Sequence, residues 1–231
     1  MIIDVNFDFR ADSNGGDPDA KSSTLRKYHR ILWSKKLPNG KYLKLDEKLH
    51  NETDACDYIF GSDSIIHSFS MWSKYQHIIK QIDPEEIEEL RGLGYTIGGM
   101  LIFPKNRINN CHSINMARGC NRKIMDRFDL TLECIKRFYE RKESPLTKSF
   151  NNYSDFLEMF VDFKNYVNFF HLQDLVTEDY TKINFHHPFV SFECNLLPET
   201  TKEYLEYKKK NIIFINNRNR RIEKWVKDNL V

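Results

Sequence analysis

The chain has 231 residues, enough for one large domain or two small ones with a sizeable core. Apolar residues make up 40% and charged residues 29%, a balance that excludes a disordered chain. The formal net charge of +2 excludes a protein that coats nucleic acid through overall basicity, although a nearly neutral protein can still concentrate positive charge locally.

Cysteine use and hydrophobicity predict a soluble cytoplasmic protein. The five cysteines are odd in number and contain no Cys-x-x-Cys motif, which excludes a zinc ribbon and a redox pair. In a chain of this size we expect reduced thiols. Charge at Asp4 excludes a secretory apolar segment, and no apolar run approaches the roughly 20 residues that cross a bilayer. We therefore expect no membrane association.

The first elements follow from alternation and capping. Apolar and polar residues alternate over 3–7, which predicts a half-buried strand. A loop rich in Asp, Gly and Ser follows, and Ser22 or Ser23 then caps a helix over 24–34. Pro38-Asn39-Gly40 predicts a turn before a short strand.

The middle of the chain predicts more strand. "DYIFGSDSIIHSFS" (57–70) is interpreted as two strands separated by an interruption at Gly61–Ser64. A helix is expected through 75–82, and Asp83-Pro84 starts another, because Asp is a good N-cap and Pro a good first residue. "YTIGGMLIFP" (95–104) is the clearest buried strand.

The second half of the sequence is helical. Helices are predicted from about Asp129 to Lys142, over 154–172, and from Thr200 or Thr201 to near the end. Apolar residues cover most of the girth of the second, so Phe160 and Phe163 should be buried. The sequence thus predicts one domain, 1–231, of the α+β class, with a small mixed sheet from the N-terminal half packed against helices from the C-terminal half.

A cluster of donors follows the strand at 95–104. Pro104 has no N–H for the ladder and ends the strand, and folds with helices packed on sheets often bind ligands at such ends. The candidate substrate-binding residues are Arg107, Ser113, Asn115, Arg118 and Arg127. Guanidinium forks match phosphate, so a nucleotide or a nucleic-acid backbone is the expected ligand. The alternative is a solvated basic loop whose arginines pair with the acidic N-terminal segment or with the Glu-rich helix that begins at Pro84.

Asp63 is the candidate catalytic acid–base residue. It lies between Ser62 and Ser64 in an apolar context, where the three side chains could bind a ribose, a metal or a water. The same residues could instead form a β-bulge and satisfy backbone donors. No GxSxG motif supports a hydrolase serine. Asp129 is interpreted first as a helix cap and second as a catalytic group.

Metal and cofactor motifs are weak. The Asp-rich loop between Asp8 and Asp19 resembles a calcium loop but has no glutamate at the twelfth position. His186-His187 has no partner set of zinc spacing. No Walker A or dinucleotide fingerprint is present, so no metal ligand is assigned and the cofactor stays unknown.

Five segments together resemble an uncharacterised family of bacterial and phage-borne proteins of similar length. They are "DPDAKSSTLRKYHRILWSKKLPNG", "FGSDSI", "TIGGMLIFP", "SINMARG" and "DRFDLTLECIKRFY". The resemblance covers most of the chain and implies a prokaryotic, cytoplasmic origin. It supplies no catalytic residues.

Two functions remain open. The first is an enzyme or effector acting on a phosphate-containing substrate, and the second is an interaction protein, such as a regulator or inhibitor, that binds an acidic partner. Convergence of the candidate side chains on one pocket favours the enzyme. We further expect Arg107 and Arg118 to lie together at the C-terminal end of the strand at 95–103, sharing an anion or a carboxylate such as that of Asp8, Asp12 or Asp63.

Overall fold

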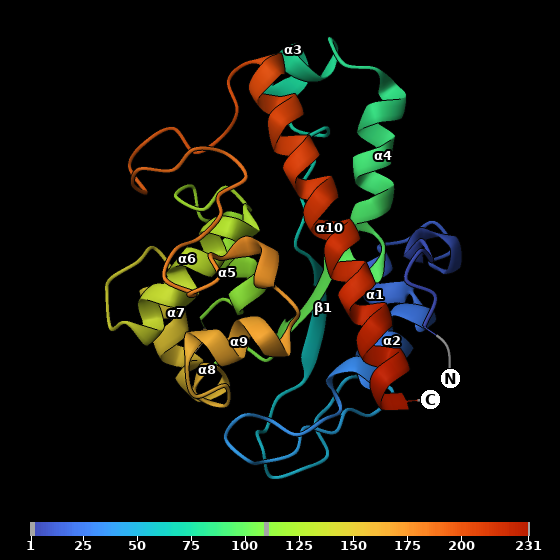
Figure 1. The fold of residues 1–231 in the computed structure, drawn as a ribbon, viewed down its shortest axis with the longest axis vertical. Coiled ribbons are helices and arrows are strands. Elements are labelled where there is room, and N and C mark those ends of the chain that lie inside the picture. Colours follow the sequence, from blue (N-terminus) through green and yellow to red (C-terminus); the bar gives the residue numbers. More distant parts are fainter. Residues whose placement is uncertain (1–2, 109–110, 231) are drawn as a thin grey trace.

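The computed structural model describes residues 3–108 and 111–230, and it has the α+β class expected from the sequence. Two strands form one antiparallel ribbon. In the view of Figure 1, the long helix α10 (Thr201–Leu230) crosses in front of this ribbon, with α5 to α9 on one side and α1, α2 and α4 on the other. Among the described helices, none is long and apolar enough to cross a membrane.

The elements have the following bounds. The strands are β1 (Phe60–Ser64) and β2 (Met100–Pro104). The α-helices before α10 are α1 (Pro18–Lys21), α2 (Ser23–Trp33), α3 (Gln76–Ile79), α4 (Pro84–Gly94), α5 (Ile114–Cys120), α6 (Phe128–Tyr139), α7 (Thr147–Asn152), α8 (Ser154–Glu158) and α9 (Phe163–Phe169). Short 3-10 helices occupy Phe9–Asp12, Ser73–Tyr75, Ile97–Gly99 and Gln173–Leu175.

The ribbon is smaller than the predicted sheet and wholly antiparallel. Its register pairs Phe60 with Pro104 and Ser64 with Met100 without a break, so Gly61–Ser64 is the strand itself, not an interruption or a bulge. All of β2 is buried, as its apolar sequence predicts. The N-terminal end of β2 therefore lies beside the C-terminal end of β1, which decides where the candidate site residues meet.

The strand predicted over residues 3–7 is wrong. The Phe7 amide donates to the Asp4 carbonyl and the Asn6 amide to the Asp4 side chain, at 3.2 and 3.0 Å. The Asp4 amide itself donates to the Tyr28 hydroxyl at 2.9 Å. A local Asp turn and a side chain thus occupy donors that a strand would need for its ladder.

Two glycines are required by close packing. A Cβ on Gly98 would lie 2.5 Å from the Asn219 side-chain oxygen, and one on Gly99 would lie 2.1 Å from the Gly94 carbonyl oxygen. The Gly98 amide also donates to that Asn219 oxygen at 2.7 Å. The double glycine therefore lets the start of β2 pack directly against α10 and the end of α4.

Capping chemistry explains the helix starts that the sequence predicted. Ser22 accepts from the Leu25 amide at 3.0 Å and Asp83 from the Glu85 amide at 2.9 Å. The helix predicted over 154–172 is instead broken into α8 and α9. Val161 takes a left-handed conformation (φ 70°) and Asp162 caps α9, so the chain turns between the two helices.

The aromatic residues of this broken segment are buried as predicted. Phe160 is 1% exposed and Phe163 8%. The Phe160 ring packs against four neighbouring rings at centroid distances of 5.1 to 5.4 Å, those of Phe156, Tyr166, Phe169 and Phe170. The break in the helix thus does not remove this segment from the core.

Helix α10 is joined to the ribbon by polar side chains as well as by its apolar stripe. The guanidinium of Arg218 is fully buried and donates from Nη1 to the carbonyl oxygens of Gly98 and Met100, both at 2.8 Å. Its Nε donates to the Phe170 carbonyl at 3.0 Å. One arginine therefore connects the last helix to β2 and to the end of α9.

Candidate functional site

A buried arginine binds two carboxylates beside the C-terminal end of β1. Arg118 of α5 is 1% exposed, and its Nη1 donates to Asp63 Oδ2 and lies 3.3 Å from Asp126 Oδ1. Its Nε donates to the Thr131 hydroxyl at 3.3 Å. The side chains of Asp63 and Asp126 are 26% and 25% exposed, so the cation is enclosed while the carboxylates reach solvent.

The two carboxylates line a cavity of about 230 Å³. His67 and Ser64 add polar groups, and the ring of Trp72 contributes an aromatic wall. The other lining residues are Ile66, Ser68, Ser70, Met71, Leu90, Arg91, Gly94 and Tyr95. The cavity lining therefore combines a few polar and charged side chains with apolar and aromatic ones, as small-molecule sites do.

His67 has a fixed tautomer. Its Nδ1 accepts from the Phe69 amide at 2.8 Å, so in the neutral ring Nε2 carries the hydrogen and faces Asp126 Oδ2 at 3.8 Å. The ring packs against Phe69 and Trp72 at 4.6 and 5.1 Å. Burial lowers the His67 pKa and the charge of Asp126 opposes that effect. Neutral His67 is thus a hydrogen-bond donor to the cavity and has no free lone pair with which to act as a base.

Two carboxyl groups near this cavity titrate close to neutral pH. Burial raises the pKa of Asp63 to about 6, with Arg118 opposing the rise and Asp126 adding to it. Burial also raises the pKa of Asp19 on α1 to about 7, and the charges of Asp63 and Asp17 add to it. Perturbed carboxyl groups with defined charge partners in a cavity are a mark of functional sites.

The backbone that presents Asp126 is strained. Met125 and Asp126 both have positive φ, 53° and 57°, although neither is glycine. Each such residue carries a conformational cost that the surrounding structure must offset. Here the turn is closed by hydrogen bonds from the amides of Ile124 and Arg127, at 3.0 and 3.1 Å.

Arg127 lies elsewhere and is fully engaged. It forms a buried bidentate pair with Asp129, Nε to Oδ1 at 3.0 Å and Nη2 to Oδ2 at 2.5 Å, and donates to the Leu196 and His187 carbonyls. Asp129 follows the first residue of α6 and is not its cap, and it also accepts from the His186 amide at 2.8 Å. Asp129 therefore has a structural contact, as its first interpretation expected, but this contact is an ion pair and not a helix cap. The pair joins residues 186–196 to α6.

The remaining predicted residues lie outside the cavity lining. Arg107 is exposed and follows the far end of β2, where Tyr153 donates to the Asn106 carbonyl. Ser113 caps α5 by accepting from the Met116 amide at 3.4 Å, and Asn115 is half-buried. Their roles in substrate binding stay predictions.

The prediction that Arg107 and Arg118 lie together at the C-terminal end of β2 is wrong. Arg118 lies at the opposite end of β2, because its carboxylate partner Asp63 is paired with Leu101 in the ribbon. The occupant of the Arg118 fork is a protein carboxylate, and Asp63 is one of the three expected.

The Asp-rich loop serves local structure. Asp8 pairs with Arg10, Asp12 accepts from the Thr24 amide at 2.9 Å, and Asp17 caps α1. Within the described ranges 3–108 and 111–230, no group of three or more His, Cys, Asp and Glu residues is arranged to hold a metal ion. The carboxylates here act as caps and ion-pair partners.

Sequence reasoning missed Asp19, His67 and Asp126. They come from segments that are far apart in the chain, and none belongs to a motif with fixed spacing. Asp126 in "KIMDRFD" gave no local signal, because its role depends on Arg118 and on the left-handed turn.

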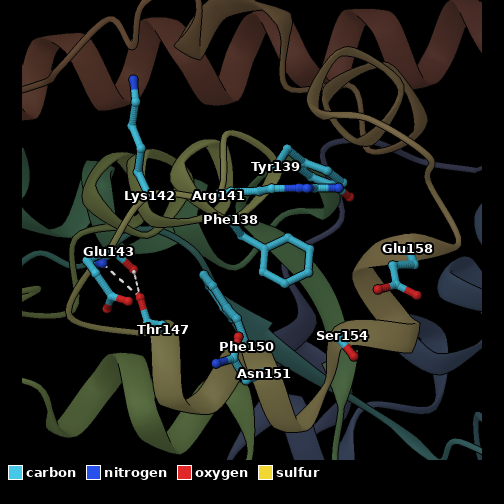
Figure 2. A pocket seen from close by; sticks show the side chains of 11 residues that line it. Phe138, Tyr139, Arg141, Lys142, Glu143, Thr147, Phe150, Asn151, Ser154 and Glu158 are labelled. Carbon is cyan, nitrogen blue, oxygen red and sulfur yellow. Dashed lines mark hydrogen bonds between the residues drawn. The ribbon is translucent and has the colours of Figure 1, made fainter.

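A larger hollow, about 480 Å³, lies between the end of α6 and helices α7 and α8 (Figure 2). The rings of Phe138 and Phe150 pack edge to face in it at 6.2 Å. Its Thr147 hydroxyl accepts from the Ser144 amide at 2.8 Å, and Tyr139 donates to the Leu157 carbonyl at 2.6 Å. These groups satisfy neighbouring backbone, so the hollow offers less chemistry than the smaller cavity beside Asp63.

Comparison with curated proteins and with solved structures finds no match for the chain. Residues 3–222 match the model of a family of unknown function, DUF6994. The match spans nearly all of the sequence, including every residue of the Asp63 cavity. The chain is therefore a member of the DUF6994 family.

Proposed function

We propose that the protein is an enzyme whose active site is the cavity beside Asp63, with Asp63 as the acid–base group. The observation that carries the proposal is that one buried guanidinium, that of Arg118, binds two partly exposed carboxylates that line a cavity. Asp63 binds Arg118 through Oδ2, so Oδ1 is free to hold a proton toward a substrate. Asp126 places a second carboxylate beside the same guanidinium, where it would stabilise positive charge on a substrate.

The substrate class follows from the charges. Asp63 and Asp126 share one buried arginine, and the Arg91 guanidinium in the lining is itself paired with Glu88 at 3.3 Å, so the charges favour a neutral or cationic group in the cavity over an anion. Carboxylates no more than about 6 Å apart, one of them with a raised pKa, suit acid-assisted hydrolysis of a glycosidic bond. The substrate is then a sugar or a nucleoside, and the phosphate of a nucleotide would contact Arg91, which also lines the cavity.

The cellular setting belongs to the same proposal. The five cysteines are free thiols, which suits a reducing compartment. We place the enzyme in the cytoplasm of a bacterial or phage-infected cell.

The test is a panel of nitrophenyl glycosides, nucleosides and nucleotides, assayed for release of the leaving group. Asp63→Asn should lower turnover about 100-fold or more, and the matched variant Asp46→Asn, at a half-buried aspartate outside the cavity lining, should not. Because the acid must be protonated, kcat/KM should fall as pH rises through about 6.

A second measurement tests the proposal without a substrate. Carboxyl-carbon NMR should show Asp63 titrating near pH 6. A titration below about pH 4, the ordinary value for an aspartate, would mean that Arg118 simply holds it ionised, and the enzyme proposal would then be dropped in favour of an interaction protein.

A further inference from the structure

A second surface, separate from the Asp63 cavity, is marked by its charge. Residues 20–48 contain nine Lys and Arg against Asp46 and Glu47, a net charge of +7, whereas the whole chain carries +2. The rest of the chain is therefore net acidic, and the positive charge of the protein is concentrated in one short segment.

The structure folds this segment into a groove. A hollow of about 670 Å³ lies between α2 and residues 42–47. Four cationic side chains line it, those of Arg26, Lys27, Arg30 and Lys44, against one carboxylate, Glu47. Lys44 pairs with Glu52 at 2.9 Å and Arg30 with Glu47 at 4.0 Å, but these pairs are exposed and weak, so a polyanion can replace them.

The groove is held in shape by hydrogen bonds between its two walls. Arg30 Nε donates to the Leu45 carbonyl at 3.3 Å, and the Leu45 amide donates to the Ser34 hydroxyl at 2.9 Å. Tyr42 donates its hydroxyl to the Ser34 carbonyl at 3.1 Å while the residue stays 51% exposed. An aromatic ring and an arginine fork are thus fixed before a ligand arrives.

We propose that this groove binds single-stranded nucleic acid. Backbone phosphates contact Arg26, Lys27, Arg30 and Lys44, and one base stacks on the Tyr42 ring. The exposed aromatic favours this ligand over an acidic peptide, because stacking on a π-face is available to every base and to few acidic side chains. The site works independently of the Asp63 cavity, which uses no residue of this groove.

The test is fluorescence anisotropy with labelled single strands of about ten nucleotides, RNA and DNA, measured over a range of salt. Four neutralised phosphates correspond to a slope of log affinity against log salt of about −2 to −3. The double variant Lys27→Gln, Arg30→Gln should reduce this slope by about 1.4. Tyr42→Ala should weaken binding about tenfold, and Tyr42→Phe, which keeps the ring, should not.

A control variant distinguishes binding in the groove from non-specific attraction to positive charge elsewhere on the surface. Lys209→Gln, on the exposed face of α10, should bind as the wild type does. No binding at low salt, or equal losses in Lys209→Gln and the groove variants, would overturn the proposal. Equal binding of poly-glutamate would assign the groove to an acidic protein, and equal binding of a DNA duplex would refute base stacking. Melting temperatures of all variants must match that of the wild type within the error.

Discussion

Replacing Asp63 by Asn tests whether this carboxyl is held near its point of titration. Its pKa is 3.8 in the unfolded chain and about 6 in the folded protein, chiefly because of burial. The folded state therefore binds the proton more tightly. The stability of the wild type relative to the variant is therefore greatest below pH 3.8 and decreases as pH rises from about 4 to 6. Above pH 6 this stability difference is constant. Asn is isosteric and can still accept from Arg118.

The magnitude follows from linkage. A rise of about two pKa units on a carboxyl that is a quarter exposed corresponds to a change of about 2–3 kcal/mol in the stability difference between pH 4 and pH 7. Asp63 also raises the pKa of Asp19, so removing its charge adds to the effect in the same direction.

Urea denaturation of wild type and Asp63→Asn at unit pH steps measures this difference. Asp46→Asn is the control, because hydrogen bonds from the amides of His50 and Lys48 lower that aspartate's pKa and its difference should have the opposite sign. A difference for Asp63 that is flat, or that favours the wild type at neutral pH, would refute the reasoning.

Three further predictions concern the fold. Phe160→Ala should lower the free energy of unfolding by about 3–5 kcal/mol in urea denaturation, because the ring is 1% exposed among four others; a loss under about 1 kcal/mol would contradict its central place. Gly98→Ala should melt at a temperature well below that of the wild type, because its Cβ would lie 2.7 Å from the Ile215 carbonyl oxygen. Gly119→Ala in α5 should melt like the wild type, because its Cβ would meet its nearest neighbour only at 4.0 Å. Equal melting temperatures of the two variants would contradict the packing argument. All five thiols should react with a thiol reagent after denaturation without reduction, and fewer than five reactive thiols would indicate a disulfide. In the native state the exposed Cys120 and Cys194 should react first. Burial raises the pKa of the Cys134 thiol to about 12, so Cys134 should react more slowly.

Local chemistry was predictable from the sequence. The helix starts after Ser22 and Asp83 depend on a side chain that caps amides two or three residues away, so the signal and the structure lie in the same short window. The burial of Phe160 also followed, because the apolar girth of its segment needs enclosure whether or not the helix is continuous.

Long-range partners were not predictable. Residues 3–7 have the alternation of a strand, but a strand needs a partner ladder, and here the Tyr28 hydroxyl takes one of its donors. Gly61–Ser64 carries loop residues, yet pairing with the buried β2 makes it a strand. Arg118 was predicted to bind an anion, but its partner Asp63 lies 55 positions earlier in the chain. No local pattern shows that the anion beside Arg118 is a side chain of the protein itself.

The basic groove is different, because its signal was present in the sequence. The excess of lysine and arginine over 20–48 can be counted directly. The predicted site was assigned to the basic stretch after Pro104 instead, but Arg118 and Arg127 in that stretch are paired with the aspartates Asp63 and Asp129.

The hydrogen bonds of Arg218 have a consequence for biosynthesis. During translation the ribbon and helices α5 to α9 emerge before α10, so the Arg218 donors to the carbonyls of Gly98, Met100 and Phe170 arrive only when residue 218 has left the ribosome. Until then the start of β2 presents unpaired acceptors and an uncovered apolar face to the cell. We therefore expect the nascent chain to expose this surface until α10 docks, and a chain released by a ribosome that stalls before that point should aggregate.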